Sequence, residues 1–485
     1  MNRLATLDAA LRVTANPTVE PLLGALLVDE LSRRGGSPPV LPEMMAKAGE
    51  FCLATEVPAL VAVYECFRQT NQEPALAAAL DELLERTFRT CRGLERAHLL
   101  ERIWAAMPYS MRAYGYLRTC CLDARFDDIL RSYPDERVPE DDLAAWIFLA
   151  QVALRSGEHG EARNILSILD ARHPGNPFVQ ELLANALIAG GDFATADAIY
   201  LRMAEHYAWP AGLIRLSDAH VGQHYASAEW DDPPERFEWL CRPPRLDATR
   251  LFVIGVDDRY AKRYLPGLLS SLARTYPQDG WRLHIHLINP APETGDWIAG
   301  LRQSGTPLCA TVERMAPRAT ETSDTRRIIE TRTYYACARF RILPRLLEQY
   351  AQPLWIIDAD MLARRPIDTL LAEAGDPAPH LGIIPLDGRA RARCLYEEYY
   401  LSMSYYAPSP ATLRFTRTLA RQINHLLACD RWGWGLDQAA IFAVVAWFER
   451  HHPDFRIARI PRSFVSDIDK GHSDAYFHSL VGSVE

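Results

Sequence analysis

Lysine is almost missing from this chain of 485 residues. Only Lys47, Lys262 and Lys470 occur, and arginine supplies the remaining positive side chains. The formal net charge is −9, so the chain lacks the basic excess that proteins use to neutralise phosphate backbones. This balance argues against nucleic acid as the main partner. The scarcity of lysine makes any lysine close to a site worth noting.

Long apolar runs and paired metal-binding cysteines are absent too. No stretch approaches the roughly 20 apolar residues of a membrane span, and the N-terminal residues lack the apolar core of a secretory signal. None of the ten cysteines forms a CxxC pair or another zinc-binding spacing. We therefore predict a cytoplasmic protein, without a transmembrane segment, whose cysteines are reduced and buried.

The N-terminal half is predicted to be helical. Residues 1–109 show apolar positions at three- and four-residue spacings with prolines at the starts of the segments. Within residues 110–220, Ala150 and Ala162 recur as Ala184 and Ala196, each displaced by 34 positions. This period of small residues resembles tetratricopeptide repeats, whose stacked helices commonly bind peptide segments. An ordinary helical bundle with fortuitous spacing is the alternative.

The C-terminal half is predicted to be an α/β domain. Residues 221–248 are rich in proline and charge and are assigned to a linker, and residues 249–485 to the domain. Strand-like and helix-like segments alternate there, which favours an open, mainly parallel sheet with helices beside it. Strands are expected at 250–256, 283–289, 354–360, 381–387 and 476–481, and helices at 264–277, 333–350, 411–428 and 437–450.

Two carboxylates follow one of these strands directly. The apolar run Leu354–Ile357 is followed by Asp358 and Asp360 around a single alanine. Side chains two apart in extended chain point to the same side, and two like charges held together favour a cation or a proton between them. Ligands of open α/β sheets bind at the carboxyl ends of strands, where Asp257 and Asp387 are also expected. Without its strand, such a pair more simply caps a turn and meets water.

An arginine is predicted on the apolar face of the helix before that strand. At 100° per residue, Arg339 shares a stripe with Tyr335 and Ile342, while Arg341 and Arg345 point away from it. A buried guanidinium is costly unless it meets an anion. The anion is either a protein carboxylate in a structural ion pair or a ligand phosphate or site aspartate.

These segments, in this order, resemble the GT-A glycosyltransferases. The helix with Ala-Arg-Phe at 338–340, the strand ending in Asp-Ala-Asp and the Asp-Gln pair at 437–438 carry the resemblance. They are most similar to the retaining, family 8-like group of glycogenin and the bacterial lipopolysaccharide glucosyl- and galactosyltransferases. The similarity spans about residues 249–482, and it ends on a strand that terminates in His478. It implies transfer of a hexose from a nucleotide sugar, usually linked to uridine diphosphate (UDP), to an acceptor hydroxyl.

The resemblance also implies roles for individual residues. Mn²⁺ or Mg²⁺ is expected on Asp358, Asp360 and His478, where a hard cation neutralises the diphosphate leaving group. The resemblance implies further that the nucleotide sugar is contacted by Asp257, Tyr260, Asp358 and Lys470, is assisted by Arg339, and has its anomeric carbon near Asp437 and Gln438.

Alternatives and departures accompany these assignments. Asp437 also reads as an ordinary helix N-cap, and His472 competes with His478 as the third metal ligand. The family usually has Asn-x-Gly where this chain has Ser402-Met403-Ser404, and its terminal lysine is absent unless Lys470 or an arginine replaces it. The tyrosine-rich segment 396–406 stacks on sugars or packs as a half-buried strand.

The leading hypothesis is a bacterial-type, metal-dependent glycosyltransferase whose helical half positions a protein, glycan or lipid-linked acceptor. A sugar nucleotidylyltransferase is disfavoured, because no glycine-rich basic loop follows the first strand. The remaining alternative is a non-catalytic repeat scaffold with a degenerate nucleotide-sugar-binding domain.

Overall fold

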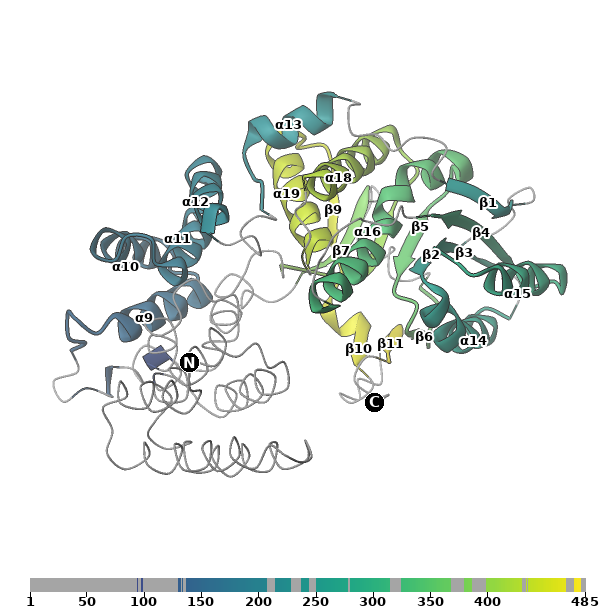
Figure 1. Ribbon diagram of the computed structural model, residues 1–485, viewed down its shortest axis with the longest axis horizontal. Coiled ribbons are helices and arrows are strands. Elements are labelled where there is room, and N and C mark those ends of the chain that lie inside the picture. Colours follow the sequence, from purple (N-terminus) through teal and green to yellow (C-terminus); the bar gives the residue numbers. More distant parts are fainter. Residues whose placement is uncertain are drawn as a thin grey trace, which may run out of the picture. The chain divides into compact units, whose positions relative to one another are not determined.

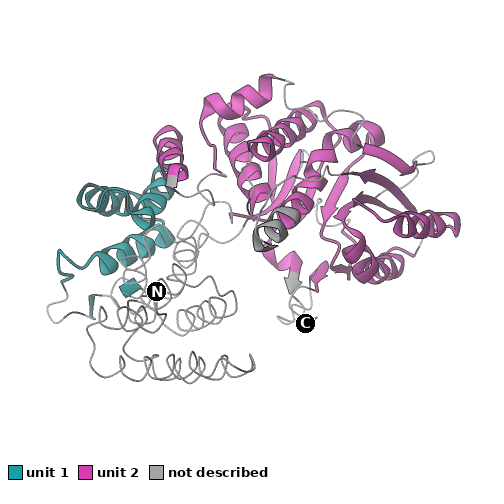
Figure 2. Ribbon diagram, viewed as in Figure 1, with its two compact units in different colours: residues 1–191, 391–393 teal, residues 192–390, 394–485 magenta. Residues whose placement is uncertain are grey.

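The chain forms two compact units in a computed structural model (Figure 2). The first comprises residues 1–191 and 391–393, and the second comprises residues 192–390 and 394–485. The residues that the structure describes are 94, 97–98, 130–131, 133, 137–206, 214–227, 237–243, 250–277, 280–314, 324–367, 379–385, 398–429, 433, 435–467 and 475–480. The predicted helical region 1–109 therefore lies almost wholly outside the described residues.

The described part of the first unit is helical. Its helices are α9 (Leu143–Ser156), α10 (His159–Arg172) and α11 (Pro177–Ala189). The side chain of Asp142 caps α9 by accepting a hydrogen bond from the backbone N–H of Ala145 at 2.9 Å. The helix ends at Gly157, which adopts a left-handed conformation with φ of 84° that glycine tolerates best.

A 34-residue displacement relates these helices to the next one along the chain. α9 and α11 begin at residues 143 and 177, and α10 and α12 (Phe193–His206) begin at residues 159 and 193. Gly191 has a φ of 83°, matching Gly157, and all four repeated alanines named above are fully buried. The described helices thus share one register, and their assignment to the tetratricopeptide class remains a prediction.

The predicted linker contains regular structure. Helix α13 (Asp218–Ala226) begins within the range assigned to the repeats, and it packs against α18 (Pro410–Ala428) and α19 (Leu436–His451) of the α/β domain (Figure 1). Strand β1 (Phe237–Cys241) pairs antiparallel with β4 (Leu308–Glu313) at the sheet edge. Its alternating half-buried and exposed residues fit an edge strand.

A mixed eight-stranded sheet forms the centre of the second unit. Its remaining strands are β2 (Arg250–Val256), β3 (Trp281–Ile288), β5 (Leu354–Ile357), β7 (Leu381–Pro385), β8 (Tyr399–Tyr406) and β9 (Ile457–Arg459), and the order across the sheet is β1-β4-β3-β2-β5-β8-β7-β9. Strands β2 to β5 are mutually parallel where they pair, whereas β8 runs antiparallel to both of its neighbours. The predicted mainly parallel sheet is therefore mixed.

The strand order reverses between β2 and β5. The chain proceeds from β2 outward through β3 and β4, and then returns to place β5 on the other side of β2. Ligands of open α/β sheets bind outside the carboxyl ends of the strands at such a reversal. Asp257 follows β2 and Asp358 follows β5, so both aspartates lie at this switch point.

Helices cover both faces of the sheet (Figure 1). α14 (Asp258–Thr275) and α15 (Pro292–Gln303) pack on one face, where Phe252 and Ile254 of β2 enter the core. α16 (Asp324–Tyr350) lies on the other face together with α18 and α19. Gly255 of β2 permits the close approach of α16, because a Cβ atom there would lie only 3.3 Å from Cβ of Arg339.

A small second sheet follows the paired carboxylates. It consists of β10 (Val465–Asp467), β11 (Phe477–Ser479) and β6 (Met361–Ala363). The backbone N–H of Leu480 donates to the carbonyl of Asp360 at 2.8 Å, which ties the end of β11 to the turn after β5. In the described part of the chain, no helix has the combination of length and apolar character that crossing a membrane requires.

Arg341, predicted to point away from the stripe of Arg339, is nevertheless buried. This side chain is 3% exposed, and its Nη1 lies 2.7 Å from Oε1 of the fully buried Glu313. The helical projection assumed that α16 has one buried face, whereas α18 packs against it from another side. Arg341 reaches α18 directly, because its Nε donates to Oδ1 of Asn424 at 2.6 Å.

Candidate active site

A pocket of about 420 Å³ opens at the switch point of the sheet. It is bounded by the ends of β2 and β5, by α16, by β8 and by the start of α19. The sequence-predicted site residues that line it are Asp257, Tyr260, Arg339, Asp358, Asp360, Asp437 and Gln438. The structure thus gathers residues from four separate segments of the second unit around one cavity.

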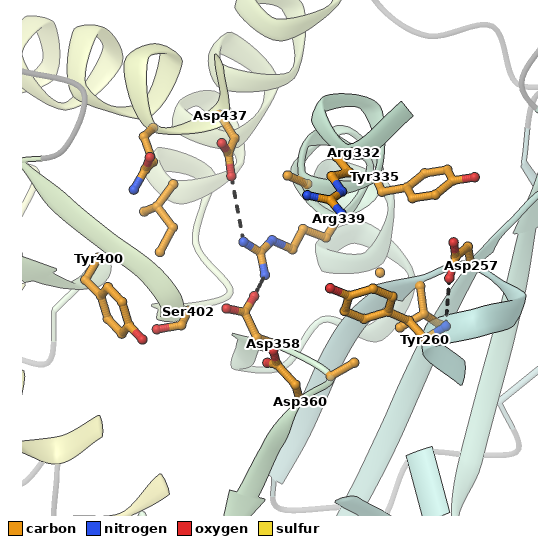
Figure 3. A pocket seen from close by; sticks show the side chains of 16 residues that line it. Asp257, Tyr260, Arg332, Tyr335, Arg339, Asp358, Asp360, Tyr400, Ser402 and Asp437 are labelled. Carbon is orange, nitrogen blue, oxygen red and sulfur yellow. Dashed lines mark hydrogen bonds and ion pairs between the residues drawn. The ribbon is translucent and has the colours of Figure 1, made fainter. Parts of the chain in front are cut away.

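Arg339 extends between two carboxylates (Figure 3). It donates a hydrogen bond to Oδ1 of Asp358, and its Nη2 lies 3.7 Å from Oδ2 of Asp437. Burial alone would lower the pKa of Arg339, but the charges of Asp358 and Asp437 raise it above its ordinary value. Its buried Nε has no hydrogen-bond partner among the described residues. The guanidinium therefore meets two protein carboxylates, with one donor left over.

The paired carboxylates differ in their surroundings. The Asp358 side chain is 35% exposed, whereas Asp360 is buried and its Oδ1 has no hydrogen-bond partner in the described structure. Burial, and then the charge of Asp358, raise the pKa of Asp360 to about 7. A buried carboxylate oxygen without a donor beside a second carboxylate is the set that a hard divalent cation prefers. The residues present therefore fit Mn²⁺ or Mg²⁺.

Asp437 is not the N-cap of its helix. Gly435 occupies that position with a φ of 91°, and Asp437 lies in the first turn with its side chain toward Arg339 (Figure 3). Burial raises the pKa of the Asp437 carboxyl; the charge of Arg339 opposes this shift and that of Asp358 adds to it. Its neighbour Gln438 donates from Nε2 to the carbonyl of Tyr399 at 3.3 Å.

The far wall of the pocket is the start of α14. Asp257 caps this helix by accepting from the backbone N–H of Tyr260 at 2.8 Å. Asp258 accepts from the backbone N–H of Ala291 at 2.9 Å, which fastens the helix start to the loop after β3. Tyr260 is 47% exposed and presents its ring at the pocket rim beside Tyr264. The start of α14 is therefore held in place by hydrogen bonds, and the ring of Tyr260 is accessible from the pocket.

Sequence reasoning missed Arg332, which also lines this pocket. The side chain is exposed and lies seven residues before Arg339, which is two turns of helix and therefore the same face. Extending the helical projection of α16 by two turns identifies it. Tyr400 and Ser402 line the pocket from β8. The hydroxyl of Ser402 is buried without a hydrogen-bond partner among the described residues.

Of the other predicted site residues, the structure describes only His478, which does not line the pocket. His478 is half-buried on β11 and pairs in register with Leu362 of β6, so its role as the third metal ligand stays a prediction. Lys470 and Asp387 lie outside the described residues, as does His472, the alternative to His478.

Comparison with known proteins found likeness only among solved structures. No family model matches the chain, and no curated protein sequence matches it. The apo structure of the bifunctional glycosyltransferase WbbM is 12% identical with a TM-score of 0.34, covering 50% of this chain and 47% of that one. This chain thus spans less than half the length of the WbbM chain.

Two further solved structures show a similar degree of likeness. The galactosyltransferase LgtC in complex with donor and acceptor sugar analogues is 15% identical with a TM-score of 0.31, covering 48% of this chain and 87% of that one. Mouse xyloside xylosyltransferase 1 in its apo form is 10% identical with a TM-score of 0.30, covering 50% of this chain and all of that one.

Proposed function

We propose that the second unit is a metal-dependent glycosyltransferase of the GT-A type, which moves a hexose from a UDP-linked sugar to an acceptor hydroxyl. One observation carries this proposal. Asp358 and Asp360 lie side by side at the switch point of an α/β sheet, in a pocket of about 420 Å³ that also holds Arg339 and Asp437.

A divalent cation is part of this proposal. Asp358 and Asp360 would hold Mn²⁺ or Mg²⁺, with His478 as the proposed third ligand. The buried Oδ1 of Asp360 without a donor and the raised pKa of this carboxyl both favour a cation there. When bound, the cation supplies positive charge against the diphosphate that leaves as the glycosidic bond breaks.

The pocket walls suggest how a nucleotide sugar is oriented. The open ring of Tyr260 offers a stacking surface for the nucleoside. The exposed guanidinium of Arg332 lines the same pocket and offers bidentate hydrogen bonds to phosphate. Arg332 would then supply the cationic contact to the diphosphate that was predicted for Lys470 or an arginine.

Arg339 and Asp437 would act on the sugar side. Arg339 fixes Asp358 and lies within 3.7 Å of Asp437, so each carboxylate is oriented by the same guanidinium. Gln438 follows Asp437 on the pocket wall, and Ser402 presents an unpaired hydroxyl from β8. We propose that Asp437 and Gln438 flank the anomeric carbon and that Ser402 bonds a donor-sugar hydroxyl. Retention of the anomeric configuration is part of the proposal.

The acceptor is proposed to be a protein or peptide, with a glycan as the alternative. This part of the proposal rests on the shared register of α9 to α12, because stacked helical repeats expose surfaces suited to polypeptide segments. A non-catalytic scaffold remains the second candidate, since Ser402 and Ser404 stand where the resembling family has asparagine and glycine.

An activity screen distinguishes these two candidates. The full chain is incubated with Mn²⁺ and a panel of UDP-sugars, and released UDP is measured beside calorimetric binding of UDP. We expect metal-dependent UDP release that falls by about 10²–10³-fold in Asp358→Asn and Asp360→Asn. Asp296→Asn, on the exposed face of α15, is the matched control. Binding of UDP without turnover of any donor favours the scaffold, and unchanged turnover in both aspartate variants refutes the proposed site.

A further inference from the structure

Three histidines meet where α13 packs on α18, within the second unit. His220 and His224 come from α13, and His425 comes from α18. One ring nitrogen from each residue lies within 4.8 Å of the other two, and the ring centroids are 4.8, 5.0 and 5.1 Å apart. None of these residues lines the pocket at the switch point.

The local structure aims these rings at a common point. His220 and His224 are four residues apart on one helix, so their side chains lie on the same face one turn apart. Two histidines at this spacing are a recurrent way for a helix to hold a metal ion. His425 supplies a ligand from the facing helix, as sites built between packed helices require.

Three ring nitrogens of His220 and His224 at this junction are buried without a hydrogen bond to any residue that the structure describes. His224 is 1% exposed, and both of its ring nitrogens are buried without a hydrogen bond to any residue that the structure describes. The same holds for Nε2 of His220. Buried imidazole nitrogens normally find a partner, because leaving them unpaired costs free energy. These ring nitrogens are therefore available to a bound ligand.

A cysteine stands beside the cluster. Cys429 lies one turn after His425, and its exposed Sγ is 3.6 Å from Nε2 of that histidine. Two ligands of one tetrahedral zinc ion, with bonds of about 2.3 Å to sulfur and 2.0–2.1 Å to nitrogen, are separated by roughly 3.5 Å. The separation between the thiol and His425 thus matches that of two ligands of one ion.

We propose that His220, His224 and His425, with Cys429 as fourth ligand, form a structural site for Zn²⁺ or a similar transition-metal ion. Nitrogen and sulfur ligands select such ions, whereas the carboxylates at the switch point select Mn²⁺ or Mg²⁺. The ion joins two helices that are about 200 residues apart in the chain, and so it clips α13 onto the helices that flank the pocket. The site is independent of the proposed transferase activity.

Cobalt binding tests this site directly. The full chain is stripped with a chelator and titrated with Co²⁺, and the visible absorption is recorded in an Asp358→Asn/Asp360→Asn background, which removes the carboxylate site. We expect one equivalent of Co²⁺, displaced by one equivalent of Zn²⁺, with tetrahedral bands and a sulfur charge-transfer band. The sulfur band should vanish in Cys429→Ser, and its absence from the parent protein would refute the fourth ligand.

Ligand variants complete the test. His220→Gln and His425→Gln should each weaken Co²⁺ affinity more than a hundredfold, since even partners outside the ligand set contribute about 10–100-fold. His173→Gln, exposed after α10, is the matched control and should bind as the parent does. Circular dichroism verifies that each variant is folded. Failure of the folded parent to bind Co²⁺ or Zn²⁺, or undiminished affinity in both glutamine variants, overturns the proposal.

Discussion

Two arginines on one helix experience opposite environments. Arg339 and Arg341 are two residues apart on α16, and both are at most 8% exposed. Arg341 joins a closed network in which Glu313 also meets His286 at 3.1 Å, and Tyr334 donates to the same carboxylate. Arg339 instead spans two aspartates at the edge of a pocket. Burial of a charge alone therefore does not distinguish structural from functional residues.

The acidic partners of the two arginines differ in the direction of their pKa shifts. Burial would raise the pKa of Glu313, but the hydrogen bond from His286 and the charge of Arg341 lower it to about 2. At the pocket, burial and the charge of Asp358 raise the pKa of Asp360 to about 7. The carboxylate of Glu313 accepts hydrogen bonds from several side chains, whereas Oδ1 of Asp360 has no hydrogen-bond donor among the described residues. A shortage of donors around carboxylates indicates the place where a cation is expected.

The largest expected effect is on stability at the closed network. Glu313→Gln removes the carboxylate that compensates the buried Arg341, and breaking such a pair costs about 3–5 kcal/mol. Urea denaturation measures this loss. Glu293→Gln, on an exposed position of α15, is the control and should change the free energy of unfolding by less than about 0.5 kcal/mol. Equal stability of the two variants would show that the network is not structural.

The second effect is on turnover at the pocket. Asp437→Asn keeps the shape of the side chain but removes its charge beside Arg339, so we expect UDP release to fall by about 10²–10³-fold. The melting temperature should change little, because Arg339 retains Asp358. Asp454→Asn, exposed after α19, serves as the reference. A variant that loses stability but not turnover would move Asp437 to the structural class.

Glu313 and Asp360 should contribute to the pH dependence of stability with opposite signs. The Glu313 pKa is lowered to about 2, so its contribution is present above about 4.5 and is lost as the pH falls from there toward 2. The Asp360 pKa is raised, so its contribution is present below about 4 and is lost as the pH rises toward 7.

Both signs are measurable in protein freed of metal by a chelator. The stability of Asp360→Asn relative to the parent should grow between pH 4 and pH 7, and the deficit of Glu313→Gln should shrink below pH 4.5. If the stabilities of the two variants changed with pH in the same direction, the proposed difference between Glu313 and Asp360 would be contradicted.

A smaller effect concerns the approach of α16 to β2. In Gly255→Ala the new Cβ lies 3.3 Å from Cβ of Arg339, so the helix must shift by a few tenths of an ångström. We expect a loss of about 1–3 kcal/mol in stability and reduced turnover. Gly295→Ala, in α15 with open space around it, should instead stabilise the protein by about 0.5–1 kcal/mol. Stabilisation of both variants would contradict the close approach.

The smallest effect lies at the end of α16. Ala351 adopts a φ of 49°, a left-handed conformation that costs a residue with a Cβ roughly 1–2 kcal/mol. Ala351→Gly relieves this strain and should raise stability by about 0.5–1 kcal/mol after the larger entropy loss of glycine. Ala299→Gly, inside α15, should lower stability by a similar amount, and thermal melts compare the two. A loss at both positions would disprove the strain.

Local sequence patterns predicted the elements with strong periodicity. The bounds of β2 match the predicted strand at 250–256, and α18 begins within one residue of its prediction. Strand β4 was not predicted, and β8 was only one of two alternatives for residues 396–406, because both strands bury polar residues such as Thr311 and Ser402. Their partners come from other strands and helices, so no local pattern reveals them.

The part of the candidate site that lies at strand ends could be predicted from the sequence. Asp358 and Asp360 follow an apolar run, and the switch point then brings Asp257 close to them. Arg332 was missed because its segment shows no apolar stripe of its own. The burial of Arg341 was not predicted, because the packing of α18 against α16 is a tertiary feature.

The central claim is that Asp358 and Asp360 hold a divalent cation that contacts a nucleoside diphosphate. Crystals soaked with Mn²⁺ and UDP test it by anomalous difference density. The account predicts a manganese peak bonded to carboxylate oxygens of Asp358 and Asp360, with the diphosphate in the same pocket. A manganese peak away from these two aspartates, or UDP bound outside the pocket, would contradict it.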